Sequence, residues 1–211
     1  GARARGNAIK KILFPLKDIL GIPLLRERLD KGILEFSCKK NNDLEEFLST
    51  RAILYEQISK SRTYLFIDED ALDEKISILG YFSIGLKTLM LPDNLSNNQI
   101  RKLDGYSSKI NREKINSLPV YLIGQLAKND QYKSLISGDE ILQAAISTIR
   151  EYSSCLSGRL IAVDCKPVDK LHEFYKRNHF IMIGHDQISG LDQFVYFLNR
   201  LQIQGERVKE F

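Results

Sequence analysis

Apolar residues recur along this chain in two spacings, one typical of β-strands and the other of α-helices. Runs rich in β-branched and aromatic residues, bounded by turn-forming residues, predict seven strands. The predicted strands are Ile33–Cys38, Thr63–Asp68, Lys75–Leu91, Val120–Ala127, Gly158–Cys165, Phe180–Ile183 and Gln193–Leu198. The run Gly158–Cys165 is apolar almost without alternation, which suits a strand that is buried on both faces.

Between these strands, apolar positions three and four residues apart predict three longer helices. One follows Asn41 and runs to about Ser59. A second begins at Ser137, where Ser137 and Glu140 have the spacing of a capping box. A third covers residues 169–178. Strands and helices in this order predict an α/β (α+β) fold, a mixed sheet with helices on both of its faces.

The N-terminal segment does not follow this regular pattern. Residues 8–33 are apolar and basic, and Pro15 and Pro23 limit any regular element there. We therefore expect a short helix or an extended arm packed on the body, rather than a membrane-surface helix, because the basic face is short. The expected organisation is an N-terminal arm (1–33), a central domain (34–200) with an insertion (92–119), and a charged tail (201–211).

The insertion is polar and carries five basic residues against three acidic ones. The basic residues are Arg101, Lys102, Lys109, Arg112 and Lys114. Ser96 and Gln99 have the spacing of a helix cap there. A basic patch for tRNA or another polyanion is one interpretation. A solvated surface excursion is the other, and we favour it because runs of charge usually mean exposure.

Composition places the chain among water-soluble globular proteins and excludes few functions. The 211 residues are 43% hydrophobic and 27% charged, with a net charge of +4, which fits an anionic partner without proving one. Three widely spaced cysteines without metal-ligand spacing indicate free thiols in a reducing, cytoplasmic compartment. Ile19–Leu25 is too short to span a membrane, and Lys17 and Asp18 break any signal peptide. Gly1–Gly6 is typical of an expression remnant and is left out of the fold prediction.

The segment Val120–Tyr152 predicts a strand, a polar loop and a helix in succession. Backbone amides at the start of such a helix can hold a phosphate. Many folds use the same unit without a ligand, and on the spacing alone we favour a structural unit. Gly124 interrupts the predicted strand, which suggests a β-bulge.

Four local motifs in this order resemble the GNAT superfamily of acyl-CoA-dependent N-acyltransferases, in particular the subgroup that includes bacterial GNAT toxins. They are Phe36-Ser37-Cys38 followed by Leu44 and Phe47-Leu48, Leu79–Ser83, Leu126-Ala127 followed by Asp130-Gln131-Tyr132, and Phe174-Tyr175 followed by Phe180. The resemblance covers roughly residues 36–198. It implies a mostly antiparallel central sheet in which one parallel strand pair splays apart around the pantetheine arm of acetyl-CoA.

The resemblance also implies the site residues. Cofactor-binding residues would be Leu126, Ala127, Lys128, Lys133, Ser134, Leu135, Ile136, Ser137 and Gly138. Substrate-binding residues would be Tyr81, Phe82 and Ser83. Tyr175 matches the family's catalytic tyrosine, and a phenol with a pKa near 10 can protonate a departing thiolate. Without the resemblance, Tyr175 would be read as core packing. No general base stands out among Glu35, His172 and His185.

Two departures from the family pattern concern the phosphate loop. Ser134 and Ile136 stand where the family usually has glycines, so two Cβ atoms must be accommodated near the phosphates. Asp139 and Glu140 complement the helix dipole but compete with a bound anion.

The resemblance leads to two functional hypotheses. The first is an N-acetyltransferase that moves an acetyl group from acetyl-CoA to a primary amine of an aminoacyl-tRNA, a protein or a small molecule. The second is a non-catalytic binding module with a degenerate CoA loop. A homodimer and an antitoxin protein are the expected protein partners, and neither a membrane nor a metal is expected.

Overall fold

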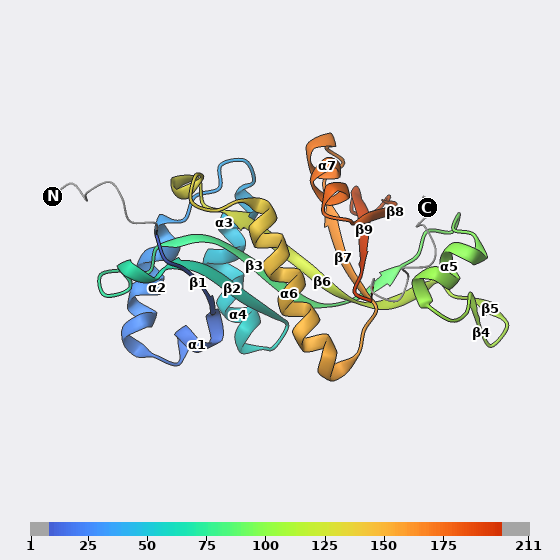
Figure 1. Ribbon diagram of the computed structural model, residues 1–211, viewed down its shortest axis with the longest axis horizontal. Coiled ribbons are helices and arrows are strands. Elements are labelled where there is room, and N and C mark those ends of the chain that lie inside the picture. Colours follow the sequence, from blue (N-terminus) through green and yellow to red (C-terminus); the bar gives the residue numbers. More distant parts are fainter. Residues whose placement is uncertain (1–8, 200–211) are drawn as a thin grey trace. The chain divides into compact units, whose positions relative to one another are not determined.

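The computed structural model describes residues 9–199 (Figure 1). These residues form two compact units. The first unit extends to Ile84 and includes Gln125–Ala145. The second consists of Gly85–Gly124 and the chain from Ile146 onward. The suggested expression remnant and the charged tail lie outside the described residues.

The elements of the first unit are β1 (Lys11–Pro15), α1 (Leu16–Leu20), α2 (Pro23–Glu35), α3 (Asn42–Glu46), the π-helical turn η1 (Phe47–Arg51), α4 (Ala52–Gln57), β2 (Ser61–Asp68) and the 3-10 turns η2 (Glu69–Ala71) and η3 (Asp130–Tyr132). Three elements have residues in both units: β3 (Ile78–Met90), β6 (Ser117–Lys128) and α6 (Gly138–Leu156). The second unit adds α5 (Asn97–Asp104), β4 (Lys109–Ile110), β5 (Glu113–Lys114), β7 (Leu160–Cys165), α7 (Asp169–Arg177), β8 (Ile181–Asp186) and β9 (Leu191–Phe197).

Within residues 9–199, seven strands form a sheet in the order β1-β2-β3-β6-β7-β9-β8. The pairs β1–β2, β7–β9 and β8–β9 are antiparallel, whereas β6 and β7 are parallel. The predicted mixed α/β sheet with one parallel pair is therefore confirmed. Six of the seven predicted strands match observed strands of this sheet.

The N-terminal segment contains a short helix, one of the two expected forms, and it is part of the folded core of the first unit. Residues 11–15 form β1, which pairs with β2, and α1 and α2 follow directly. Leu16, Ile19 and Leu29 are completely buried in one apolar cluster with residues of β2 and β3. The two prolines delimit elements instead of preventing them: Pro15 ends β1, and Pro23 occupies the first turn of α2, where a missing N–H costs nothing.

The predicted strand Ile33–Cys38 is wrong. Ile33 belongs to α2, which ends at Glu35, and the following residues form a loop before α3. Leu34 is 85% exposed, so the apolar run does not alternate between a buried and a solvated face as a strand would. The alternation of buried Phe36 and Cys38 reflects two loop side chains that enter the core.

The insertion is anchored in the second unit by its own apolar residues. Ser96 caps α5 with both bonds of a capping box, as its spacing with Gln99 predicts. The buried side chains Leu95, Ile100, Leu103 and Ile115 pack in one cluster with Leu160 and Val195 of the sheet. The polar residues of β4 and β5 remain exposed, so the insertion is a surface excursion with a buried base.

The parallel pair β6–β7 is short within the second unit. All six residues of β7 pair with β9, but its register with β6 covers Tyr121–Ile161 and Leu122–Ala162 alone among the described residues. Gly124 follows two residues after the last pair and is exposed. A parallel pair that separates this early agrees with the predicted splay, while the bulge at Gly124 stays a prediction.

Candidate functional site

The loop that follows β6 is fixed by the buried side chain of Asn129, in the first unit. Asn129 is 1% exposed, and its Nδ2 donates to the carbonyl oxygen of Ile78 at 2.8 Å. Its Oδ1 accepts from the amides of Ser37 at 3.3 Å and Gln131 at 3.0 Å. One amide side chain therefore joins β3, the 36–41 loop and the start of η3.

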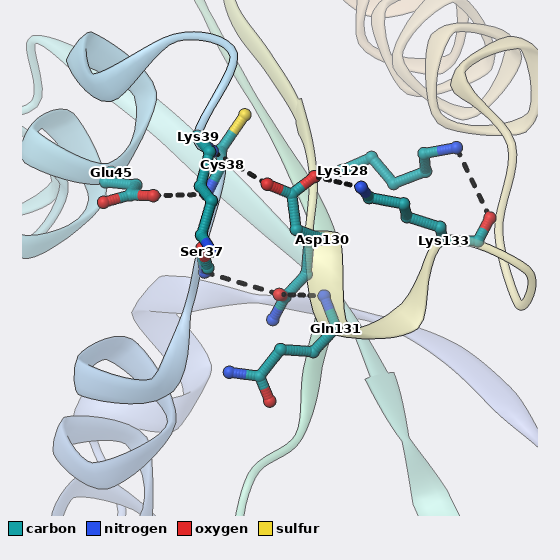
Figure 2. A network of polar contacts seen from close by, with 9 residues as sticks. Ser37, Cys38, Lys39, Glu45, Lys128, Asp130, Gln131 and Lys133 are labelled. Carbon is teal, nitrogen blue, oxygen red and sulfur yellow. Dashed lines mark hydrogen bonds and ion pairs between the residues drawn. The ribbon is translucent and has the colours of Figure 1, made fainter.

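Asp130 adds a second set of contacts between the same loops (Figure 2). Its carboxylate accepts from the Lys39 amide at 2.8 Å and lies 3.4 Å from Lys133 Nζ, and its own amide donates to the Ser37 carbonyl at 2.7 Å. The Lys39 amide, followed by Lys133, holds the pKa of the Asp130 carboxyl below its usual value. The Asp130 carboxyl is therefore ionised, and its contacts hold the beginning of the loop in place before any ligand binds.

The far end of the loop is capped by Ser137 and held by Lys11. Ser137 Oγ accepts from the Glu140 amide at 3.0 Å, which confirms one half of the predicted capping box. The Glu140 carboxylate does not complete the box but pairs with Lys11 Nζ at 2.8 Å. Lys11 Nζ also donates to the carbonyl oxygen of Leu135 at 2.9 Å. A lysine of β1 thus offsets the acidic charge at the start of α6.

Four backbone N–H groups in this loop have no acceptor among the described residues: those of Ser134, Ile136, Ser137 and Gly138. Unpaired N–H groups at a helix N-terminus are the usual ligands of phosphates. The Ile136 side chain is buried, so its Cβ is directed into the core while its amide stays unpaired. Ser134 is exposed. The two non-glycine positions therefore leave these backbone N–H groups unpaired, as the predicted phosphate site requires.

The other predicted cofactor-binding residues lie at the end of β6 and in the loop. Ala127 is buried, and its carbonyl oxygen would lie 2.8 Å from a Cβ placed on Gly80, so β3 and β6 approach closely here because Gly80 has no side chain. Lys128 and Lys133 bring positive charge to the loop, with Lys128 Nζ 3.4 Å from the Lys133 carbonyl oxygen.

The predicted substrate-binding residues Tyr81, Phe82 and Ser83 are all buried. The Tyr81 hydroxyl donates to the Leu44 carbonyl at 2.6 Å, its ring stacks on Phe47, and burial raises its pKa. These side chains are packed in the core, so any contact with substrate would use the backbone of β3. Their role stays a prediction.

Tyr175 lies in the second unit on α7, with its ring packed against Phe174, Phe180 and Phe194. Its hydroxyl makes no hydrogen bond to the described residues. Burial, and then the neighbouring Cys165 thiol, raises the pKa of Tyr175, so the phenol is protonated at neutral pH. A protonated phenol without a protein acceptor can act as a proton donor.

Two sets of polar contacts between separate elements were not predicted from the sequence. His172 Nε2 lies 2.6 Å and His185 Nδ1 2.7 Å from the two oxygens of the buried Asp192. The three residues come from α7, β8 and β9, and the two histidines hold the pKa of Asp192 low against its desolvation. The other is the set of contacts from Lys11 to the Leu135 carbonyl and the Glu140 carboxylate, which we call the Lys11 clamp. Lys11 and Glu140 are 129 positions apart in the sequence. No local pattern in the sequence marks either contact.

Comparison with known proteins identifies the fold. No protein-family model matches the sequence, and no curated protein matches it. The chain is similar to a tyrosine-to-phenylalanine mutant of KacT, with 16% identity and a TM-score of 0.67 over 92% of this chain and 98% of the other. It is also similar to AtaTR bound with AcCoA (16%, TM-score 0.66, 91% and 96% covered) and to AtaT complexed with acetyl-methionyl-tRNAfMet (16%, 0.64, 92% and 98%).

AtaT, a toxin, has also been solved bound to the C-terminus of its antitoxin AtaR. At this identity the likeness establishes the fold, and the GNAT-toxin-like fold expected from the sequence motifs is confirmed. Among the described residues, no helix is long and apolar enough to cross a membrane, and no group of three or more His, Cys, Asp or Glu side chains is arranged so that it could hold a metal ion.

Proposed function

We propose that this protein is an N-acetyltransferase that transfers an acetyl group from acetyl-CoA to a primary amine. The observation that carries the proposal is the set of unpaired N–H groups at Ser134, Ile136, Ser137 and Gly138, on the fold of toxins that have been solved with acetyl-CoA. The early separation of β6 from β7 supports it, because pantetheine needs strand backbone that is not already paired.

Different groups of residues have separate roles in the proposed reaction. The loop amides bind the diphosphate of the coenzyme, and Lys128 and Lys133 add positive charge. The backbone of Leu126 and Ala127 orients the thioester arm and offers an N–H to the carbonyl oxygen as negative charge develops there. The coenzyme supplies an activated acetyl group as a thioester. The amine nitrogen bonds to the acetyl carbon as the C–S bond breaks, and the proton that the nitrogen loses goes to water. Tyr175 holds the proton that the sulfur takes up, because its phenol is protonated at neutral pH and its hydroxyl has no acceptor among the described residues.

The acceptor that we propose is the α-amino group of an aminoacyl-tRNA. This amine has a lower pKa than a lysine side chain, so a larger fraction is neutral at pH 7 and the reaction does not require a strong general base. The structure of AtaT with acetyl-methionyl-tRNAfMet supports this choice. The AtaR complex of AtaT supports an antitoxin as the protein partner, and a homodimer stays part of the proposal.

Thermal unfolding in the presence of acetyl-CoA is the first test. A ligand at 100 times its Kd stabilises the native state by about 2.7 kcal/mol, which gives a clear rise in Tm. Radiolabelled acetyl transfer to bulk aminoacyl-tRNA, to free amino acids and to a lysine-rich protein then identifies the acceptor. An unchanged Tm at millimolar acetyl-CoA would contradict the enzyme proposal and would favour the binding module with a degenerate loop.

A further inference from the structure

A cavity of about 480 Å³ in the second unit is lined by two arginines. Arg150 comes from α6 and Arg159 from the residue before β7. Neither guanidinium pairs with a carboxylate of residues 9–199. The acid that lines this cavity, Asp104, is already engaged by the amides of Tyr106 and Ser107 at 3.2 and 2.9 Å. The cavity therefore carries net positive charge.

Both guanidinium groups are held in place but are not saturated. Arg159 donates to the carbonyl oxygens of Leu103 and Lys102 at 3.4 Å each, which are long hydrogen bonds at the end of α5. Its Cζ would lie 2.3 Å from a Cβ on Gly105, so the guanidinium lies directly over this glycine. Arg150 donates to the Tyr196 hydroxyl at 3.1 Å. With five N–H donors each, both groups can still bind a planar or tetrahedral oxyanion.

The backbone between α6 and β7 is unusual where it forms the wall of this cavity. Ser157 has φ of 76° and Gly158 of 136°, two consecutive left-handed residues, one of them not glycine. The Tyr121 hydroxyl donates to the Ser157 carbonyl, and the Tyr121 ring occupies the space that a Cβ on Gly158 would need. Such backbone conformations persist where the surroundings fix them, and they cluster at binding sites.

A second cavity of about 420 Å³ shares Pro119, Ser157 and Gly158 with the first and has the opposite character. It is lined largely by apolar groups, including the Tyr121 ring, and by Leu86 and Leu156, which are 74% and 70% exposed. Two large aliphatic side chains exposed beside an aromatic ring are suited to the flat face of a nucleobase.

From this pairing of a cationic and an apolar cavity, we propose that the second unit binds a nucleotide of a single-stranded RNA segment. The arginine cavity takes the phosphate and the apolar cavity takes the base. An acidic peptide could bind in the first cavity through its carboxylates, but it would leave the apolar second cavity unfilled. The exposed basic residues of the insertion, Arg101 and Lys102 of α5 among them, extend the positive surface along the RNA backbone.

This assignment rests on the proposed function, because it supplies the RNA contact that an aminoacyl-tRNA acceptor requires. Its test nevertheless needs no acetyl-CoA. Binding of a short fluorescein-labelled single-stranded RNA is followed by anisotropy at several salt concentrations, beside a blunt duplex of the same sequence. We expect tighter binding of the single strand, since bases inside a duplex cannot enter the apolar cavity.

The decisive variant is Arg150→Gln combined with Arg159→Gln. Because both arginines contact one phosphate, their loss should lower the steepness of log affinity against log salt by about 0.7 and weaken binding roughly tenfold or more at 0.1 M salt. The charge-matched control is Lys170→Gln combined with Lys176→Gln on α7, which should bind RNA like the wild type. Leu156→Ser should weaken single-strand binding while leaving the salt slope unchanged.

A further variant tests whether the loss of RNA binding comes from misfolding. Arg150→Lys combined with Arg159→Lys keeps both charges, and we expect it to restore the salt slope. Equal RNA binding by the glutamine variant and the wild type would overturn the proposal, as would displacement of the RNA by poly-glutamate but not by free nucleotides. If acetyl-CoA raises the Tm but no RNA binds, this site is refuted while the acetyltransferase proposal stands.

Discussion

At the scale of single residues, the proposed proton transfer depends on Tyr175. This residue is buried, it is protonated at neutral pH, and its hydroxyl is unpaired among the described residues. The hydroxyl is not among the fully buried polar atoms without a partner, so it keeps accessible surface. A hydroxyl that a ligand can reach supports the proposed role of Tyr175 as the proton donor.

Replacing Tyr175 with phenylalanine keeps the aromatic packing and removes the proton. We expect acetyl transfer to fall about 10²-fold or more, with the Kd for acetyl-CoA unchanged and the Tm unchanged or slightly higher. Single-turnover kinetics and calorimetry measure the two quantities. Wild-type turnover in this variant would remove Tyr175 from the mechanism.

At the scale of elements, α2 shows how packing reverses an intrinsic preference. Alanine is normally favoured over glycine inside a helix by about 1 kcal/mol. At Gly32, however, a Cβ would lie 2.1 Å from the carbonyl oxygen of Ile76, a backbone atom that cannot move cheaply. The helix approaches this neighbouring segment closely because Gly32 has no side chain.

We therefore expect Gly32→Ala to destabilise the protein by roughly 2 kcal/mol or more in urea unfolding. The matched control is Gly21→Ala just before α2, where a Cβ would meet its nearest neighbour at an ordinary 3.7 Å. This control should be neutral or slightly stabilising. Equal effects at the two positions would mean that α2 and the 76–78 segment are farther apart than described.

The Lys11 clamp is the second prediction at this scale. Lys11→Met should leave stability within about 1 kcal/mol, because the pair with Glu140 is partly exposed. Acetyl-CoA affinity should nevertheless fall several-fold, because the Leu135 carbonyl is released and the Glu140 charge is no longer offset. Lys10→Met is the matched control, since the neighbouring Lys10 pairs with Glu69, away from the loop. Calorimetric titration of both variants with acetyl-CoA decides the point.

At the scale of the whole molecule, three carboxyl groups link stability to acid pH. The pKa values of Asp130, Asp186 and Asp192 all lie below the ordinary value of 3.8. A depressed folded-state pKa contributes stability that is present above the unfolded value and is lost as the pH falls through the folded value. Stability should therefore hold from neutral pH to about pH 4 and then decline.

Urea unfolding between pH 7 and pH 3 measures this decline. Asp192→Asn should show a smaller loss below pH 4, because it removes one of the three carboxyl groups. It should have a lower stability at pH 7, because one of the two oxygens that face His172 and His185 becomes an NH2 group and the negative charge is lost. Identical acid profiles for the variant and the wild type would exclude Asp192 from the linkage.

Much of the sheet could be predicted from the sequence because most of its strands are long apolar runs. The strand Ile33–Cys38 was wrong because buried Phe36 and Cys38 imitate alternation in a loop. β1 was missed because Pro15 and its basic neighbours suggested an irregular arm, whereas pairing with β2 tolerates a proline at the end of an edge strand.

The parts of the candidate site that depend on residues close together in the sequence could be predicted. The capping contact of Ser137 follows from spacing, and the Tyr175 assignment followed from a motif. Contacts such as Lys11 with Glu140, or His172 and His185 with Asp192, join separate elements and depend on the finished fold. They carry no periodic signal, so a single sequence cannot reveal them.

The distance in sequence between Lys11 and the loop that it supports has a consequence for synthesis on the ribosome. Lys11 leaves the exit tunnel long before its partner Glu140, 129 residues later, has been translated. The loop amides that we propose to bind phosphate cannot therefore reach their final arrangement in a growing chain until α6 has emerged and Glu140 has paired with Lys11 of β1. A nascent chain of this protein would therefore lack the proposed coenzyme site until α6 has been translated.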